Sequence, residues 1–182
     1  MSNFNIEKTI PNIEKIKANS EDDLFKLGGF VMHPVYGIGR VESREEKNID
    51  ESIYNFATLS FNNEKLKMTI NTNLQKNMIR KLIDIEDIPK LLEYLKEYKS
   101  DLPIKSPERY NINLKKIKSS DIKMLIQVIK DLVMLSRAKK LTPKEVSMLK
   151  QSKKTLASEI AFVSSITEEK ADEMIEGTCR NL

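Results

Sequence analysis

The sequence predicts an α+β protein with two domains: a small five-stranded SH3-like or Tudor-like β-barrel, followed by an all-α helical domain. Two observations support this prediction. Short apolar segments with strand-like alternation, separated by glycine and asparagine, fill residues 25–82, whereas apolar residues recur at helical spacing from residue 83 onward. Residues 1–24 are polar with scattered Ile and one proline, so we expect a flexible extension there. The domains are therefore expected at 25–82 and 83–182.

The barrel is expected to start with a turn at Gly28-Gly29, where glycine allows a positive φ. Gly37 and Gly39, two residues apart in a strand, predict a bulge or a close backbone approach. The polar segment 45–52 is expected to be a loop, and Asn62-Asn63 a hairpin turn. The expected strands are 30–32, 38–42, 54–61, 65–70 and 78–82.

Helices are expected over residues 86–98 and 106–117, the second with Ser106 as its N-cap and Pro107 in its first turn. Ser119 or Ser120 is expected to cap the next helix. That helix carries a stripe predicted to be buried, which consists of Ile122, Leu125, Ile126, Ile129, Leu132 and Val133.

The segment Thr142-Pro143-Lys144-Glu145 has the pattern of a capping box with proline at the first helical position. The helix that it starts is expected to bury Val146, Leu149, Leu156, Ile160 and Val163. A last helix is expected to begin at Thr167 and to stop at Gly177.

Basic residues are concentrated in one part of the chain. The net charge is only +4, but residues 103–154 hold 14 basic and 4 acidic side chains, a net charge of +10. This pattern is typical of a nucleic-acid contact. The alternative is a solvated lysine-rich face in a lysine-rich proteome.

Several function classes find no support in the composition. Cys179 is the only cysteine and His33 the only histidine, so we expect no disulfide, no metal site and no cofactor, and a structural role for His33. The acids at Asp84, Glu86 and Asp87 fall at a helix start, where they favour the helix dipole. The sequence shows no signal peptide and no apolar run of membrane-spanning length. We therefore expect a cytoplasmic protein that is not an enzyme and does not bind a membrane.

The barrel opens with FKLGGFVMHPVYGIGRV, and its later strands read FATLSF and LKMTI. These segments resemble the RNA-polymerase-interacting domain of the CarD/CdnL transcription regulators, and transcription-repair coupling factors carry a similar barrel. The segment ERYNINLKKIKSSDIKMLIQVIKDLVMLSRAKKLTPKEVSMLKQSKKTLASEIA resembles the helical DNA-binding half of the same family. The resemblance covers about residues 25–177, and the combination of the barrel with RY-x3-L and KxLTPKE is specific to the family.

The resemblance implies that the barrel binds the RNA polymerase β subunit, and that the helical half contacts the minor groove and phosphates of promoter DNA, stabilising the open complex. We expect the protein to be a monomer. The polymerase contacts would map to Arg40, Lys47, Lys67, Met68 and Thr69. The alternative is that these are ordinary strand and loop residues.

For DNA, the resemblance implies a wedge at Ser106, where relatives commonly have a tryptophan that this chain lacks, and a minor-groove or phosphate contact from Arg109. Further phosphate contacts are expected from Lys115, Lys116, Lys118, Arg137, Lys139, Lys140, Lys150, Lys153 and Lys154. Each of these could instead be a solvated surface residue. A second hypothesis is a nucleoid-type protein that binds DNA without polymerase.

Overall fold

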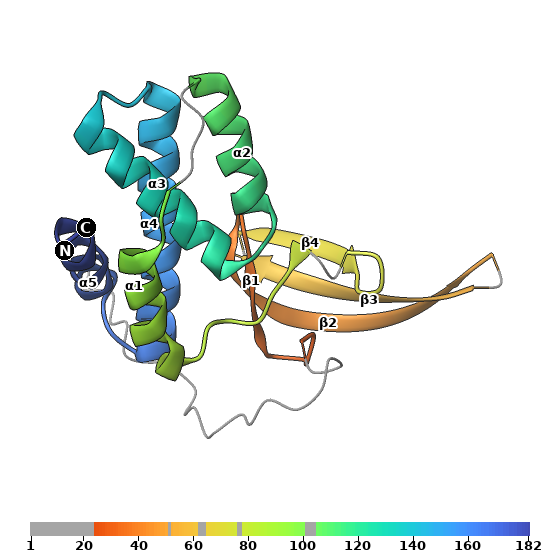
Figure 1. Ribbon diagram of the computed structural model, residues 1–182. Helices are drawn as coiled ribbons and strands as arrows, with labels where there is room; N and C mark the ends of the chain where they lie inside the picture. The colour runs from red at the N-terminus through yellow and green to blue at the C-terminus, as the bar shows by residue number, and fades with distance from the viewer. Residues whose placement is uncertain (1–23, 51, 62–64, 76–77, 101–104) are drawn as a thin grey trace, which may run out of the picture.

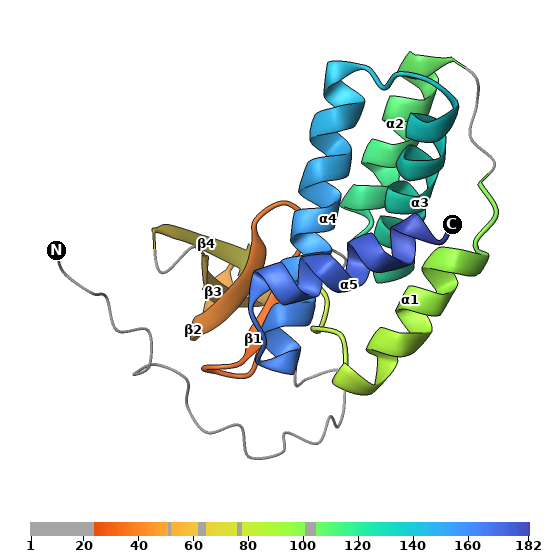
Figure 2. The same cartoon turned by 90° about the vertical axis from the view of Figure 1, so that its left-hand side faces the viewer.

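A four-stranded antiparallel sheet lies beside five helices in the computed structural model (Figure 1), which describes residues 24–50, 52–61, 65–75, 78–100 and 105–182. The expected extension, apart from Leu24, and the expected turn at Asn62-Asn63 lie outside these residues. We call residues 24–82 the sheet region and residues 83–182 the helical region. Both views place α4 next to the sheet (Figure 2).

The strands follow one another in sheet order, from β1 to β4. They are β1 (Phe30–His33), β2 (Gly37–Ile49), β3 (Ser52–Phe61) and β4 (Leu66–Asn71). The prediction of a fifth strand and a closed barrel was wrong for the described residues. Arg80, in the expected last strand, forms only an isolated bridge with Met32, in which each N–H donates to the other residue's carbonyl at 2.8 and 3.1 Å.

The predicted loop at 45–52 was also wrong, because β2 and β3 continue through it as a long hairpin that turns at Asp50 (φ 49°). The ammonium of Lys47 lies 5.4 Å from the centre of the Phe56 ring, a cation–π contact between the two strands. Since β4 pairs only with the Phe56–Phe61 part of β3, the outer half of the hairpin extends beyond the sheet (Figure 1).

Glycine has two of the expected roles in the sheet region. Gly28 adopts a φ of 77°, which favours glycine over other residues. A Cβ atom at Gly39 would lie 2.4 Å from the Phe61 ring, so this strand position needs glycine for a close approach. The register shift lies nearby, between Val41 and Ser43. The core of this region consists of Leu24, Phe25, Val31, Val41, Ala57, Leu59, Phe61, Ile70 and Ile79.

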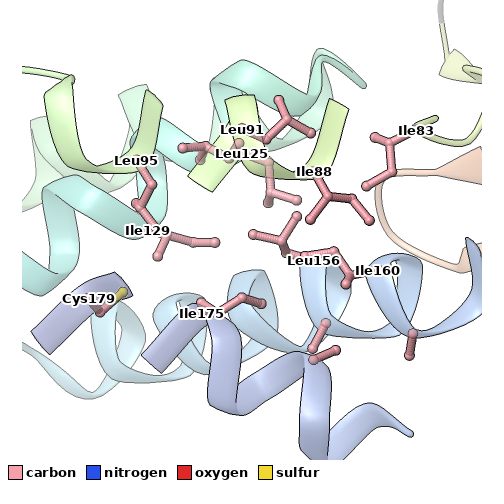
Figure 3. Packing of buried hydrophobic residues seen from close by; sticks show 14 of the residues in the cluster. Ile83, Ile88, Leu91, Leu95, Leu125, Ile129, Leu156, Ile160, Ile175 and Cys179 are labelled. Carbon is pink, nitrogen blue, oxygen red and sulfur yellow. The ribbon is translucent and has the colours of Figure 1, made fainter. Parts of the chain in front are cut away.

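The larger apolar core of the helical region takes side chains from α1, α3, α4 and α5 (Figure 3). A second, smaller cluster consists of Val128, Leu132, Leu141 and Met148. A short 3₁₀ helix, η4 (Ile85–Asp87), precedes the first α-helix. The α-helices are α1 (Ile88–Glu97), α2 (Ser106–Lys118), α3 (Ile122–Ala138), α4 (Pro143–Ser164) and α5 (Glu168–Arg180). No described helix is long and apolar enough to cross a membrane.

The predicted capping box is confirmed. The Thr142 hydroxyl accepts the Glu145 N–H at 3.3 Å, and the Glu145 carboxylate accepts the Thr142 N–H at 2.9 Å. The prediction that Val146 is buried was wrong, because its side chain is 52% exposed. The first turn of α4 instead turns Glu145 inward.

Two other helix ends differ from the prediction. The N-cap of α3 is Asp121, whose carboxylate accepts the Lys123 N–H at 2.8 Å, rather than Ser119 or Ser120. Helix α5 continues through Gly177 to Arg180. A glycine stops a helix only where the backbone turns left-handed, and Gly177 does not.

The N-cap of α2 is Lys105, one residue before the expected cap at Ser106. Lys105 has an extended backbone and forms no side-chain cap hydrogen bond. Ser106 is therefore the first residue of the helix, and its hydroxyl donates to Glu145 of α4 instead.

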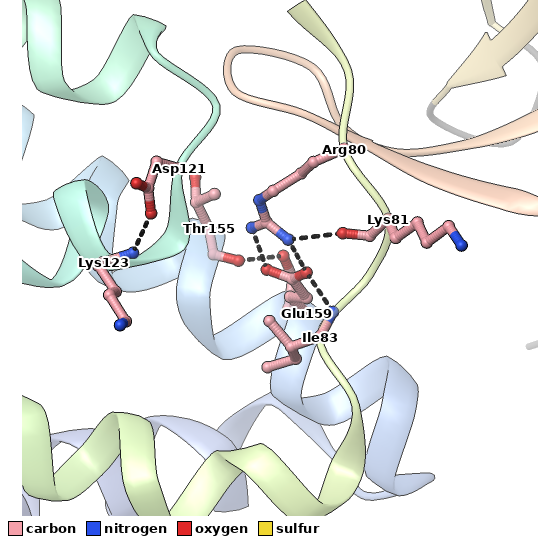
Figure 4. Close-up of polar contacts among 8 residues, drawn as sticks. Arg80, Lys81, Ile83, Asp121, Lys123, Thr155 and Glu159 are labelled. Carbon is pink, nitrogen blue, oxygen red and sulfur yellow. Dashed lines mark hydrogen bonds and ion pairs between the residues drawn. The ribbon is translucent and has the colours of Figure 1, made fainter. Parts of the chain in front are cut away.

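A buried ion pair joins the sheet region to the helical region (Figure 4). The Arg80 guanidinium donates to both carboxylate oxygens of Glu159 on α4, at 2.5 and 2.6 Å, and Glu159 is fully buried. The same carboxylate accepts the Ile83 N–H at 3.0 Å. Nearby, the rings of Phe30 on β1 and Phe162 on α4 meet edge-to-face at 4.8 Å. These contacts fix how the sheet sits on α4.

We expect Arg80→Ala to lower the free energy of unfolding by about 3–5 kcal/mol, because it leaves the Glu159 carboxylate buried without its counter-ion. Urea unfolding monitored by circular dichroism measures this change. Lys90→Ala, which breaks the exposed pair with Asp87, is the control and should leave the midpoint unchanged. A midpoint for Arg80→Ala equal to that of the control would contradict the assigned role of the pair.

Candidate functional site

The outer edge of β4 is open, since no strand in the described part of the chain pairs with it. In an antiparallel pair, main-chain groups alternate between facing the partner strand and facing away. The Thr72 N–H donates to the Asn55 carbonyl on β3, which places the main-chain groups of Thr69 and Asn71 on the outer side. Asn71 agrees, because its N–H donates to the Gln75 side chain at 2.9 Å. The main chain of Thr69 thus faces the open edge.

Two of the residues expected to bind polymerase lie close together. Arg40 on β2 and Lys67 on β4 both stand opposite Ser60 of β3, so they share one face of the sheet about 10 Å apart. Lys67 also pairs with Glu42 at 2.7 Å, and this hydrogen bond lowers the pKa of the Glu42 carboxyl.

The other three expected contacts differ in exposure and place. Met68 packs partly into the core of the sheet region, and the Thr69 hydroxyl lies 3.0 Å from that of Thr58. Lys47 pairs with Glu45 at 3.1 Å and lies toward the tip of the hairpin, roughly 20 Å from Arg40 along β2. The structure therefore does not bring Lys47 together with Arg40 and Lys67.

The clearest cationic surface lies at one end of the helical region, where the start of α2, the end of α3 and the start of α4 meet (Figure 1). Lys139 and Lys140 are exposed there, next to the capping box. The structure adds Lys105 and Lys144 to the same end, both exposed, with the Lys144 ammonium 5.7 Å from the centre of the Tyr110 ring. We call these four lysines the basic end.

Sequence reasoning missed Lys105 and Lys144, although their signals were present. Lys105 directly precedes a predicted helix, and Lys144 lies inside the capping box itself. Two helix starts side by side bring such residues together, but the sequence does not show which helix ends are neighbours.

Arg109 lies beneath the basic end and is only 3% exposed. Its Nη2 and Nε donate to Oε1 of Glu145 at 2.8 and 3.2 Å, and the Ser106 hydroxyl donates to the same oxygen at 3.3 Å. Oε2 of Glu145 accepts from the Thr142 hydroxyl at 2.8 Å, in addition to the Thr142 N–H. The guanidinium of Arg109 therefore faces the protein interior rather than a DNA phosphate.

Burial raises the pKa of the Glu145 carboxyl, but the hydrogen bonds from Thr142 and Arg109 outweigh burial and hold the pKa below its ordinary value. Glu145 is thus ionised at neutral pH. Its position in the first turn of α4 also favours the negative charge, because the helix dipole is positive there.

Three more of the expected DNA contacts are engaged within the protein. Arg137 donates to the carbonyls of Cys179, Arg180 and Leu182 at the end of the chain. Lys153 pairs with Glu176 of α5 at 2.5 Å.

Lys116 is the third of these residues, and it pairs with the buried Asp131 at 2.9 Å. Burial lowers the pKa of Lys116, but the hydrogen bonds and charge interactions with Asp131 and Tyr98 together outweigh burial, and the net pKa is raised. Lys116 therefore keeps its charge but directs it toward α3.

The other expected DNA contacts are exposed lysines, and none of them forms an ion pair with a described carboxylate: Lys115, Lys118, Lys139, Lys140, Lys150 and Lys154. Lys115 and Lys118 lie at the far end of α2, about 20 Å from the basic end, because α2 has 13 residues. Lys150 and Lys154 lie one turn apart on α4. The cations thus spread along the helical region rather than forming one cluster.

His33 stabilises the turn between β1 and β2. It is buried, and its Nδ1 accepts the Val35 and Tyr36 N–H groups at 3.0 and 3.2 Å. Burial lowers the pKa of His33, which keeps the imidazole neutral and Nδ1 able to accept. Among the described residues, no group of acids, histidine or cysteine could hold a metal ion.

Comparison with known proteins identifies the family. The family model of the CarD-like/TRCF RID domain matches residues 25–83, and that of the CarD C-terminal domain matches residues 90–176. YdeB of Bacillus subtilis (strain 168), a protein named as a candidate transcription factor, is 29% identical over 147 residues, which cover 80% of this chain and 95% of YdeB. The chain belongs to the CarD-like family of transcription factors.

Membership in the CarD-like family confirms the resemblance read from the sequence and supports a role in transcription regulation. The two matched segments correspond to the two structural regions of the chain. The first covers the sheet with its open edge, and the second covers most of the helices and the exposed lysines.

Proposed function

We propose that the protein binds the RNA polymerase β subunit through its sheet region and promoter DNA through its helical region, and that it thereby modulates the stability of the open complex. Membership in the CarD-like family supports the regulatory role. The observation that carries the rest of the proposal is that an open strand edge and a set of exposed lysines lie on two regions locked together by Arg80 and Glu159.

The proposed polymerase contact is strand addition at the open edge of β4. Such a contact uses main-chain hydrogen bonds, for which the outward-facing main chain of Thr69 is suited. Arg40 and Lys67, on one face of the sheet, would add charge complementarity to an acidic partner surface. The main-chain groups of Met68 face β3 rather than the open edge, so Met68 would not pair with an added strand. Lys47 would contribute only if the partner reaches the hairpin tip.

The proposed DNA contacts are the exposed lysines of the helical region. They are the basic end (Lys105, Lys139, Lys140 and Lys144) together with Lys115, Lys118, Lys150 and Lys154. Lys116, Arg137 and Lys153 have partners within the protein, so we assign them a structural role first. Arg109 is left out of the contact surface because it is buried.

The proposed effect on transcription needs no chemical step. A protein that binds the melted promoter more tightly than the closed one shifts the population by that difference in affinity. Ser106 offers little apolar area for a wedge between bases, and its hydroxyl already donates to Glu145. Phosphate contacts are therefore expected to dominate the DNA affinity.

A nucleoid-type protein that acts without polymerase is the second candidate, favoured by the exposed lysines alone. With the cognate polymerase, the open-complex lifetime should change when the full chain is added. An unchanged lifetime, combined with tight and salt-sensitive DNA binding, would favour the nucleoid-type function instead.

Thr69→Pro should weaken binding of the full chain to the polymerase β subunit, because proline removes the outward N–H and blocks an added strand at this edge. Thr69→Val keeps the main chain and is the matched control. Pull-down or interferometry with the isolated β lobe measures the difference. Equal binding by the two variants would contradict strand addition at β4.

Binding of the full chain to duplex DNA should depend strongly on salt, with a slope of log K against log salt of about −5 if six lysines neutralise phosphates. Replacing Lys139 and Lys140 together with alanine should reduce the slope by about two. The control is Lys170→Ala on the acidic helix α5, which should leave the slope unchanged. If neither the Lys139/Lys140 double substitution nor Lys170→Ala changes the slope, the basic end does not contact DNA phosphates.

A further inference from the structure

Helix α2 is held on the helical region by buried polar side chains and by partly buried apolar ones. Its only fully buried residues are Arg109 and Asn113, 3% and 0% exposed, which lie one turn apart on one face. Its apolar side chains, Tyr110, Ile112, Leu114 and Ile117, are only partly buried. Burial of apolar surface is the main source of helix stability in proteins. Because α2 buries less apolar surface than α3 or α4, it gains less stability from packing.

The polar face of α2 is not fully satisfied by the protein. Neither the amide oxygen nor the amide nitrogen of Asn113 has a hydrogen-bond partner among the described residues, and the same holds for the hydroxyl of Ser152 on α4. A buried polar group without a partner is destabilising. Among the described residues, Arg109–Glu145 is the ion pair that joins α2 to α4, and both of its side chains are buried.

Glu145 makes this contact while it also closes the capping box of α4. One of its oxygens accepts from Arg109 and Ser106 on α2, and the other accepts from Thr142. The first turns of two neighbouring helices thus share a single carboxylate. Two donors of the Arg109 guanidinium converge on one oxygen of Glu145, so they constrain the position of the two turns more than a single point charge would.

We propose that Arg109 is a positioning residue: through Glu145 it holds the first turn of α2 beside the first turn of α4, and it thereby aligns Lys105 with Lys139, Lys140 and Lys144 as one phosphate-binding surface. Arg109 does not itself touch DNA. When the Arg109–Glu145 ion pair opens, α2 detaches from α3 and α4 as a unit, while α3, α4 and α5 stay folded. The role in DNA binding rests on the proposed function, whereas the holding of α2 does not.

Hydrogen exchange of the free, full-length protein, followed by mass spectrometry, tests the structural half. In Arg109→Ala, amides of residues 106–118 should exchange roughly ten- to hundredfold faster, because hydrogen bonds to a charged group are lost. Amides of α3 and α5 should be unchanged, and α4 should keep its start because Thr142 still caps it. Lys115→Ala, which removes an exposed charge from the same helix, is the matched control and should leave the exchange of α2 unaltered.

Duplex DNA affinity tests the functional half. Arg109→Ala should weaken binding more than Lys115→Ala does, although Arg109 is buried, and Arg109→Lys should restore only part of the loss. Unchanged protection of α2 in Arg109→Ala, or equal loss of protection in all helices, would overturn the holding role. A loss of protection without any loss of DNA affinity would overturn the aligning role. If the wild-type protein does not bind duplex DNA at all, the proposed function fails, while the exchange result stands on its own.

Discussion

The arrangement of the two regions depends on the buried pair between Arg80 and Glu159. Arg80 acts twice: its main chain bridges Met32 of β1, and its side chain holds a carboxylate that is fully buried on α4. The edge-to-face rings of Phe30 and Phe162 also join the two regions. Because an ion pair with two parallel hydrogen bonds tolerates little change in angle, it sets the orientation of the sheet relative to the helices.

Helix α4 organises the molecule through two inward-facing glutamates. Glu145 anchors α2 at its start, and Glu159 anchors the sheet region further along. Fourteen residues separate them, which is close to four helical turns, so both lie near one face of the helix, about 21 Å apart. Buried ion pairs add little stability compared with apolar packing, but breaking one is costly. Two such pairs along one helix therefore specify geometry more than they add stability.

The sequence predicted those features that follow from local chemistry. The capping box at Thr142, the turn at Gly28 and the change from strand to helical periodicity all depend on neighbouring residues. Whether the sheet closes into a barrel, and whether Arg109 is exposed or buried, depend on distant partners instead. Arg80 and Glu159 are 79 residues apart, and Arg109 and Glu145 are 36 apart. An arginine on a helix looks the same in a sequence whether it faces solvent or a buried carboxylate.

These constraints bear on how the proposed function could favour melted DNA. Lysine–phosphate contacts do not by themselves favour a melted promoter, because duplex DNA has a higher charge density than its separated strands. The chain has no tryptophan to insert between bases, and the hydroxyl of Ser106 is bonded to Glu145. Any preference for the melted state must then come from where the lysines are held relative to the polymerase. That placement is set by the two pairs on α4, with Arg80–Glu159 fixing the sheet region and Arg109–Glu145 fixing the first turn of α2.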